Sequence, residues 1–185
     1  MLTRLFAVGL IFAVVAVVLA MVTTQAQAAS REEIDIRVAA ALEKLYDSVL
    51  AGRELAEKAE GVLVFPRVYK AGFIVGGEYG EGSLLVDGNP VQYYSIASGS
   101  VGLQVGAQAR IEILMFLETD ALEQFRRSDG WEVGVDGSVA LLTVGVGDEI
   151  DTNSIKAPII AFILDNQGLM LNLSLEGSKI SKIDR

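Results

Sequence analysis

The residues best suited to binding chemistry lie in the stretch 65–73, which combines basic and aromatic side chains. Arg67 and Lys70 could contact phosphate oxygens, and rings such as Tyr69 and Phe73 could seat against acyl or glycerol groups. Such rings favour sites that are apolar at one end and wet at the other, as in a lipid headgroup region. The candidate lipid-binding residues are therefore Arg67, Tyr69, Lys70 and Phe73. Ordinary core packing with two exposed charges is the alternative interpretation.

The side chains on which many hydrolases and redox proteins depend are absent. The chain has 185 residues with no His and no Cys. This composition excludes Ser-His-Asp and Cys-His catalysis, the usual zinc ligand sets, iron–sulfur clusters, c-type haem and disulfides. No serine lies in a G-x-S-x-G motif. We therefore expect no catalytic residues, no cofactor and no enzymatic activity.

Two further polar motifs favour loops over binding sites. The glycine-rich stretch 76–82 superficially resembles a phosphate loop, but it lacks the Gly-Lys-Ser/Thr ending, and its two glutamates would repel phosphate. We expect a turn or a β-bulge there. The acidic residues of 148–153 do not fit a calcium loop, so a solvated acidic loop without a metal is expected.

The charge balance restricts the class of partner. With 15 Lys+Arg against 24 Asp+Glu, the formal net charge is −9. Nucleic-acid binding depends on Lys and Arg that release counterions from phosphates, so no nucleic-acid partner is expected. The same acidity predicts weak or zwitterionic lipid binding unless the cations are locally isolated.

The N-terminus has the pattern of a secretory signal peptide. Arg4 precedes an uncharged apolar run over 5–22, and the Ala-Gln-Ala of 26–28 has small residues where a signal peptidase reads them. We expect cleavage after Ala28, a single domain over 29–185, and a periplasmic location that could be peripheral to a membrane. The alternative is an uncleaved anchor, because the apolar run reaches the lower length limit of a membrane span.

Residues 30–59 are predicted to be mainly helical. Ser30 and Glu33 form a capping box, and an apolar stripe follows at helical spacing, ending near Gly52. The stripe consists of Ile34, Val38, Ala41, Leu45 and Val49, widened by Leu42 and Tyr46. The opposite face is mixed and mostly acidic, which favours a helix packed on the core over one lying on a membrane. A second short helix is expected over 54–60.

Beyond Gly61 the pattern becomes that of β-strands separated by Gly, Asp, Asn and Pro. The expected strands are 62–65, 72–75, 83–86, 92–96, 101–108, 111–117, 131–135, 139–146, 159–164 and 170–175. The stretch 65–73 is interpreted as a connection between strands, and Asp87-Gly88-Asn89 is predicted to form a turn. One helix, beginning at Thr119 or Asp120, is expected to interrupt the strands.

The predicted fold class is α+β, with N-terminal amphipathic helices followed by a mainly antiparallel sheet. Two strands, 111–117 and 158–164, are apolar on both faces and should be covered on both sides. Other strands carry repeated glycines, which weaken a strand unless they permit a bulge, a sharp coil or a close backbone approach. We therefore expect a strongly curved, Gly-rich sheet or partial barrel.

Several of these motifs together resemble the SYLF domain family. They are AEGVLVFP at 59–66, KAGF at 70–73, GGEYGEG at 76–82, YYS at 93–95, GSVGLQVGAQ at 99–108, DGSVA at 136–140 and LSLEG at 173–177. The resemblance implies a lipid-binding domain, with actin binding in eukaryotic members, and this chain looks like the exported bacterial branch. In eukaryotic members an amphipathic N-terminal segment is associated with membrane contact. The mostly acidic face of the corresponding helix here departs from that role.

These observations predict a non-enzymatic domain of the bacterial periplasm or cell envelope that binds a phospholipid or a membrane surface. The alternative is a structural or protein-interaction module of the envelope without a lipid ligand. In that case the exposed rings would serve as anchors for an envelope protein.

Overall fold

A computed structural model of the chain describes residues 29–72, 75–101, 106–142, 155–165, 168–169 and 175–185. The predicted signal segment 1–28, the candidate Phe73 and the acidic cluster 148–153 lie outside the described residues. Among the described helices, none combines the length and the apolar character needed to cross a membrane.

The N-terminal helices form where the apolar spacing predicts them. Helix α2 (Arg31–Ser48) begins at Ser30, whose side-chain oxygen accepts a hydrogen bond from the backbone N–H of Glu33 at 3.2 Å. The buried side of α2 consists of Ile34, Val38, Ala41 and Leu45. Helix α3 (Gly52–Lys58) follows after a short turn, so the predicted break near Gly52 is the start of the second helix. The capping residue and the apolar stripe therefore place α2 on the core.

The rest of the described chain forms one curved sheet with a single helix inserted in it. In chain order the elements are β1 (Gly61–Gly72), β2 (Val75–Val86), β3 (Asn89–Val101), β4 (Gly106–Phe116), α4 (Thr119–Arg127), β5 (Trp131–Glu132), β6 (Val139–Leu141), β7 (Ile159–Asp165), β8 (Gly168–Leu169) and β9 (Lys179–Ile183). The strand order is β5-β9-β3-β2-β1-β4-β7-β6, with β8 beside β7. All pairs are antiparallel except β6 with β7. The predicted α+β class with a strongly curved, mainly antiparallel sheet is confirmed.

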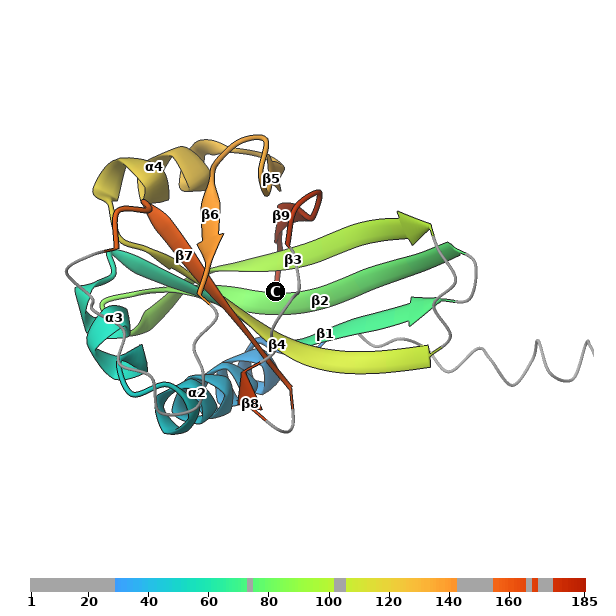
Figure 1. The fold of residues 1–185 in the computed structure, drawn as a ribbon, viewed down its shortest axis with the longest axis horizontal. Helices are drawn as coiled ribbons and strands as arrows, with labels where there is room; N and C mark the ends of the chain where they lie inside the picture. Colours follow the sequence, from blue (N-terminus) through green and yellow to red (C-terminus); the bar gives the residue numbers. More distant parts are fainter. Residues whose placement is uncertain (1–28, 73–74, 102–105, 143–154, 166–167, 170–174) are drawn as a thin grey trace, which may run out of the picture.

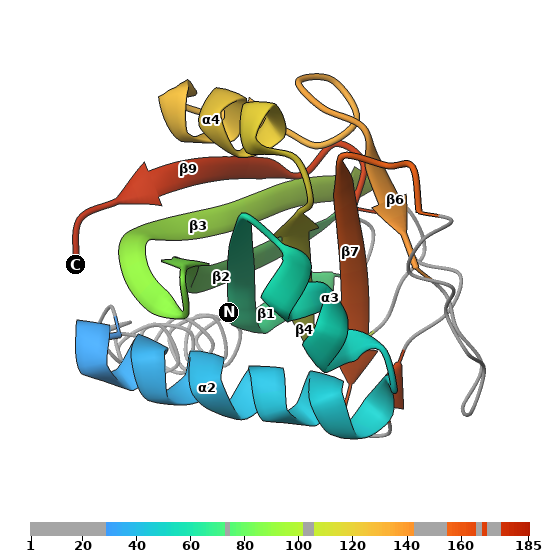
Figure 2. The same ribbon diagram turned by 90° about the vertical axis from the view of Figure 1, so that its left-hand side faces the viewer.

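Two layers of side chains cover the two faces of this sheet. Figure 2 shows α4 above the sheet and α2 below it, with α3 in front of β1 and β4. Alternate residues of the central strands β4 and β7 enter the two cores: Ile113 and Phe162 face the α2 side, whereas Leu114 and Ile163 face the α4 side. On the α4 side Phe125 contacts three other rings, which belong to Tyr94, Phe116 and Trp131. The prediction that these two strands are covered on both sides is confirmed.

The stretch 65–73 is where the sequence interpretation of the strands was wrong. Rather than connecting two strands, residues up to Gly72 continue β1 through Pro66, and the register with both neighbouring strands shifts at this point. This β-bulge tolerates a proline because the extra residue of a bulge does not need to donate to the ladder. The chain therefore stays extended beyond Pro66, and its side chains alternate between the faces.

Glycines on the neighbouring strand allow the bulge to pack closely. A Cβ on Gly82 would collide with the carbonyl oxygen of Val64, and one on Gly80 would lie 2.8 Å from that of Arg67. The glycine-rich stretch 76–82 therefore belongs to β2 and lies opposite the bulge of β1, rather than forming a turn of its own. Its glycines serve close backbone approach.

The turns explain the other differences in strand length. Asp87 and Gly88 both have positive φ, 51° and 74°, and the predicted Asp-Gly turn joins β2 to β3. The expected strand 101–108 is not a single strand among the described residues, because β3 ends at Val101 and β4 begins at Gly106. The expected strand 131–135 ends early, at Glu132, where Gly134 with φ 87° begins a tight turn.

The far parts of β1 to β4 extend beyond the two helical layers. Only residues 93–97 of β3 pair with β9, and only residues 111–116 of β4 pair with β7. Figure 1 shows the four long strands continuing to the right, away from the helices. The bulge of β1 lies where this projecting part leaves the core.

Candidate functional site

A cavity of about 650 Å³ lies between the start of α2 and the adjacent face of β1 and β2. We call it the arginine–tyrosine cavity. It is lined by Ala29, Glu33, Ile34, Arg37, Pro66, Arg67, Tyr69, Tyr79, Gly80, Glu81 and Arg185. Three arginines, two glutamates and two tyrosines therefore meet beside a small apolar surface.

The register of two strands places four of these side chains together. Arg67 of β1 is opposite Glu81 of β2, and Tyr69 is opposite Tyr79. Residues two apart on a strand share a face, so all four side chains line the same cavity. Tyr69 and Tyr79 are 55% and 50% exposed. Two half-exposed phenols thus stand at the opening.

Arg67 differs from the other arginines of the cavity in its partners. Its Nη1 donates to the hydroxyl of Tyr69 at 3.2 Å, and its guanidinium carbon lies 5.9 Å from the centre of that ring. Within the part of the chain that the structure describes, it makes no ion pair with a carboxylate. Most of its N–H donors are therefore available to an anion.

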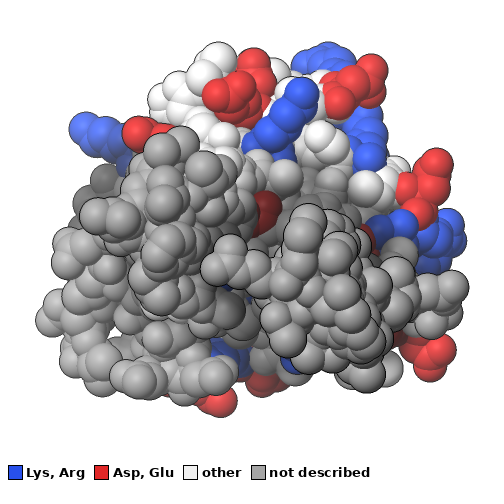
Figure 3. Space-filling model, turned by 90° about the vertical axis from the view of Figure 1, so that its right-hand side faces the viewer, with Lys and Arg blue, Asp and Glu red and all other residues white. Residues whose placement is uncertain are grey.

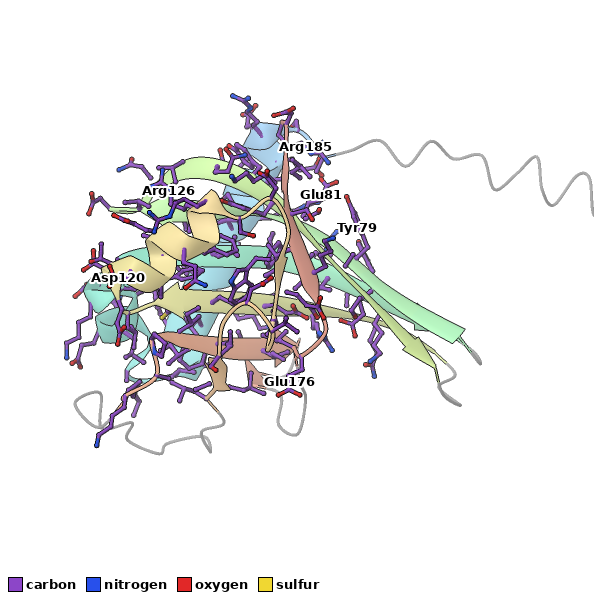
Figure 4. The ribbon with its side chains drawn as sticks, turned by 90° about the horizontal axis from the view of Figure 1, so that it is seen from above. Tyr79, Glu81, Asp120, Arg126, Glu176 and Arg185 are labelled. Atoms are coloured by element: carbon purple, nitrogen blue, oxygen red, sulfur yellow. The ribbon has the colours of Figure 1, made fainter. Side chains whose placement is uncertain are left out.

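The other two arginines are neutralised. Arg37 pairs with Glu33 on α2. Arg185 holds Glu81 with both its Nε, at 3.1 Å, and its Nη2. The hydroxyl of Tyr79 also donates to Glu81, at 2.7 Å. Figure 4 shows Tyr79, Glu81 and Arg185 gathered on one side of the molecule.

These contacts set the ionisation of Glu81. Its burial opposes the charged form, but hydrogen bonds from Arg185, Tyr79 and the backbone N–H of Ala29 favour it more strongly, so the pKa of Glu81 is below its ordinary value. Burial, followed by the hydrogen bond to Glu81, raises the pKa of Tyr79. The carboxylate is therefore ionised and the phenol neutral at pH 7.

Lys70 does not join this cavity. Its ammonium lies 3.1 Å from Glu78 on β2, and Glu78 in turn lies 2.6 Å from Arg110 on β4. Arg110 lies 2.5 Å from Glu112. Lys70 directly follows Tyr69 on β1, so its side chain points to the opposite face of the sheet. Of the sequence-predicted candidates, the structure brings Arg67 and Tyr69 together and places Lys70 elsewhere, and Phe73 lies outside the described residues.

The network of ion pairs that begins at the partly exposed Lys70 leads to buried charged groups. Glu112 is fully buried, and its Oε2 has no hydrogen-bond partner. Burial raises the pKa of Glu112, although Arg110 acts in the opposite direction. Two cations and two carboxylates alternate along this chain of residues, so it offers no free cation to a ligand.

The cavity residues that the sequence analysis did not name include three that contact one another, Tyr79, Glu81 and Arg185. Tyr79 and Glu81 alternate with glycines in the stretch that suggested a turn, and an extended reading of that stretch would have put both side chains on one face. No local sequence pattern indicates the contact of Arg185 with Glu81, because the pairing of β9 with β3 brings the two residues together. The contact joins residues 104 positions apart.

The chemistry of the cavity suits an anionic group attached to an apolar one. The guanidinium of Arg67 can donate two parallel hydrogen bonds to phosphate or carboxylate oxygens, and Ile34 and Pro66 add apolar surface beside it. In the described part of the chain, no cluster of acidic residues has the arrangement of a metal site. Where Figure 3 shows described residues, basic and acidic side chains are interspersed.

Comparison with known proteins bears on the C-terminal half of the chain. None of the curated proteins matches the sequence. Residues 97–185 match the family model described as Ysc84: Las17-binding protein actin regulator. This segment begins within β3 and includes the predicted motifs from Gly99 onward, whereas β1 and β2 precede it. Over residues 97–185 the chain is therefore similar to the Ysc84 (SYLF) family, and the resemblance found in its motifs is confirmed there.

Proposed function

We propose that this protein is a non-enzymatic domain that binds phospholipid headgroups at a membrane surface, and that the arginine–tyrosine cavity holds the headgroup phosphate. The Ysc84 (SYLF) family is a family of lipid- and actin-binding domains, which supports the class of ligand. The signal-peptide pattern of 1–28 supports export to the periplasm.

The observation that carries the proposal is the availability of Arg67. Its guanidinium faces a cavity without a carboxylate partner among the described residues, whereas Arg37 and Arg185 are paired. A phosphate would supply the missing anion through charge-assisted hydrogen bonds. The cavity lining carries three arginines against two glutamates, so the local charge is positive although the whole chain has a charge of −9.

The two tyrosines fit the apolar part of the same ligand. Tyr69 and Tyr79 are each about half exposed and stand beside the cavity opening. Tyrosine rings stabilise positions at which an apolar surface meets water, including the headgroup region of a bilayer. A phospholipid that places its phosphate on Arg67 would bring its glycerol region against these rings.

The overall acidity limits which membranes the domain would bind. An acidic protein is repelled by a strongly anionic surface, and the repulsion is screened by salt over about 10 Å at 0.1 M. The attraction must therefore come from the local contact at Arg67. We expect measurable binding to vesicles of mainly zwitterionic lipid with a minor anionic component.

Vesicle co-sedimentation with two charge-reversal variants tests this function. The vesicles consist of phosphatidylcholine with one fifth phosphatidylglycerol. Arg67→Glu should lower the affinity of the protein for these vesicles about tenfold, equivalent to about 1.4 kcal/mol of binding free energy. Arg127→Glu is the matched control, because Arg127 is exposed on α4, away from the cavity, and the change in net charge is the same. Equal binding by the wild type and the Arg67→Glu variant would show that the cavity is not the lipid site.

The family description also favours a second function, because it names a protein partner. In that case the cavity would receive a carboxylate-bearing segment of an envelope protein. Vesicle binding would then be absent for every lipid composition, and Arg67→Glu would abolish capture of a defined partner that the wild type retains.

A further inference from the structure

The first described residue, Ala29, lies at the arginine–tyrosine cavity. It lines the cavity, and its backbone N–H donates a hydrogen bond to the carboxylate of Glu81. Ala29 immediately precedes Ser30, the N-cap residue of α2, so the start of the helix fixes its position. The position of this backbone nitrogen is thus determined from both sides, by the helix and by Glu81.

The same residue is the expected first residue of the processed chain. The Ala-Gln-Ala of 26–28 predicts cleavage after Ala28. Hydrolysis of the peptide bond by a signal peptidase would add water across it and leave a carboxylate on Ala28 and an α-ammonium group on Ala29. The nitrogen that now donates as an amide would then carry a full positive charge.

We propose that Glu81 is the docking site for the α-ammonium group of Ala29 that signal-peptide cleavage creates. The inference concerns the chain's own amino end and goes beyond the headgroup function. It requires a carboxylate that is already ionised, already within hydrogen-bond distance of the nitrogen, and able to accept another charged donor. Glu81 meets all three requirements.

Glu81 is suited to hold two cations. Its side chain is 13% exposed, and an ionised carboxylate has about four acceptor positions. Arg185 and Tyr79 use both oxygens without surrounding them completely. An ammonium at Ala29 would replace a single amide donor with three donors that can rotate toward the same carboxylate.

The other charged and titratable groups that face Glu81 come from β2, β1, the segment after β9, and α2. From its own strand Tyr79 donates to it, from β1 Arg67 is its register partner, and Arg185 approaches beyond β9. On α2 the facing pair is Glu33 with Arg37, which is neutral as a pair. The low pKa of Glu81 agrees with a site built to keep this carboxylate charged.

Docking would change the charge of the ligand cavity, a consequence that rests on the proposed function. The lining carries three arginines and two glutamates, and the α-ammonium would add one more positive charge beside Arg67. Processing would then strengthen binding of a phosphate-bearing headgroup. Export and readiness to bind lipid would be linked through one carboxylate.

The test measures the pKa of the α-amino group in the processed protein. The full chain is produced with its own N-terminal segment in a secreting bacterial host, and intact mass establishes the first residue of the exported product. The rate of acetylation of the amino terminus by acetic anhydride is then followed against pH. An ordinary α-amino group has a pKa of about 7.7–8.0. Docking on Glu81 should raise it by about one unit, because a neighbouring carboxylate favours the charged form.

Two variants make the result specific. Glu81→Gln should return the α-amino pKa to the ordinary range, whereas Glu33→Gln, in the same cavity but paired with Arg37, should leave it raised. Circular dichroism checks that both variants are folded. An ordinary pKa in the wild type, or an exported chain that begins at another residue, would overturn the inference. Neither result would affect the Arg67 vesicle test, which reports on the headgroup function alone.

Discussion

Arg67 and Lys70 are three residues apart on β1 and point to opposite faces of the sheet. Arg67 lines the arginine–tyrosine cavity, whereas Lys70 pairs with Glu78 at 3.1 Å on the other side. An odd separation on a strand places two side chains on different faces. The two cations of the sequence motif therefore have different surroundings, because one lines the arginine–tyrosine cavity and the other belongs to a network of ion pairs.

The first prediction follows from this separation. Lys70→Gln should leave vesicle binding unchanged, because Lys70 does not line the cavity. It should lower the free energy of unfolding by about 1 kcal/mol or less, since the ion pair with Glu78 is partly exposed. Co-sedimentation and urea denaturation of the same variant check both parts. A loss of vesicle binding comparable to that of Arg67→Glu would mean that Lys70 does contact the ligand.

The second prediction concerns the bulge that carries Arg67. Gly82→Ala should destabilise the fold by about 3 kcal/mol or more, because its methyl group would meet the backbone carbonyl of Val64. Gly99→Ala is the matched control on β3, where a Cβ would meet nothing within 4 Å. Its effect should stay within about 0.5 kcal/mol. Equal urea midpoints for the two variants would contradict the close approach of β1 and β2.

The third prediction concerns the aromatic cluster beneath α4. Phe125 is 1% exposed and its ring centre lies 4.9 Å from those of Tyr94 and Phe116. Phe125→Ala should cost about 3–5 kcal/mol of unfolding free energy. Arg126→Ala on the exposed side of α4 should cost little. Thermal denaturation compares the two, and similar melting temperatures would show that α4 does not pack as described.

The fourth prediction is a pH dependence with a defined sign. Burial raises the pKa of Glu112 above its unfolded value, so its contribution to stability is present below the unfolded pKa, about 4.3, and is lost as the pH rises through the folded value. The unfolding free energy of the wild type minus that of Glu112→Gln should therefore fall as the pH rises through this window.

Glu81 provides the opposite case on the other face of the sheet. Its pKa is lowered, so its contribution is present above the unfolded pKa and is lost as the pH falls through the folded value. The difference between the wild type and Glu81→Gln should rise with pH over the acidic range. Denaturant titrations at a series of pH values measure both slopes. Slopes of the same sign would contradict the assignment of the two carboxylates.

The parts of the fold that depend on local periodicity could be predicted from the sequence. Ser30 and the apolar stripe beginning at Ile34 identified α2, and the uninterrupted apolar runs identified β4 and β7 as strands covered on both sides. The path of β1 could not be predicted in this way. Pro66 normally argues against a continuous strand, and the bulge that accommodates it depends on glycines of β2 that are distant in sequence.

The candidate site was also predictable only where it depends on local sequence. Arg67 and Tyr69 share a face because they are two apart, and they were both identified by residue type. Lys70 was grouped with them because the stretch was interpreted as a connection, to which strand alternation does not apply. Arg185 joins the cavity through pairing between strands remote in the sequence, which no local pattern reports.

The most direct test of the central claim observes Arg67 itself during lipid binding. The labelled domain is titrated with short-chain phosphatidylglycerol below its micelle concentration, and the side-chain Nε–H resonance of each arginine is followed by NMR. If the cavity holds the headgroup, the Nε–H resonance of Arg67 shifts saturably and that of Arg127 on α4 does not shift. An unchanged Arg67 resonance in a protein that still binds the lipid would contradict the assignment of the cavity.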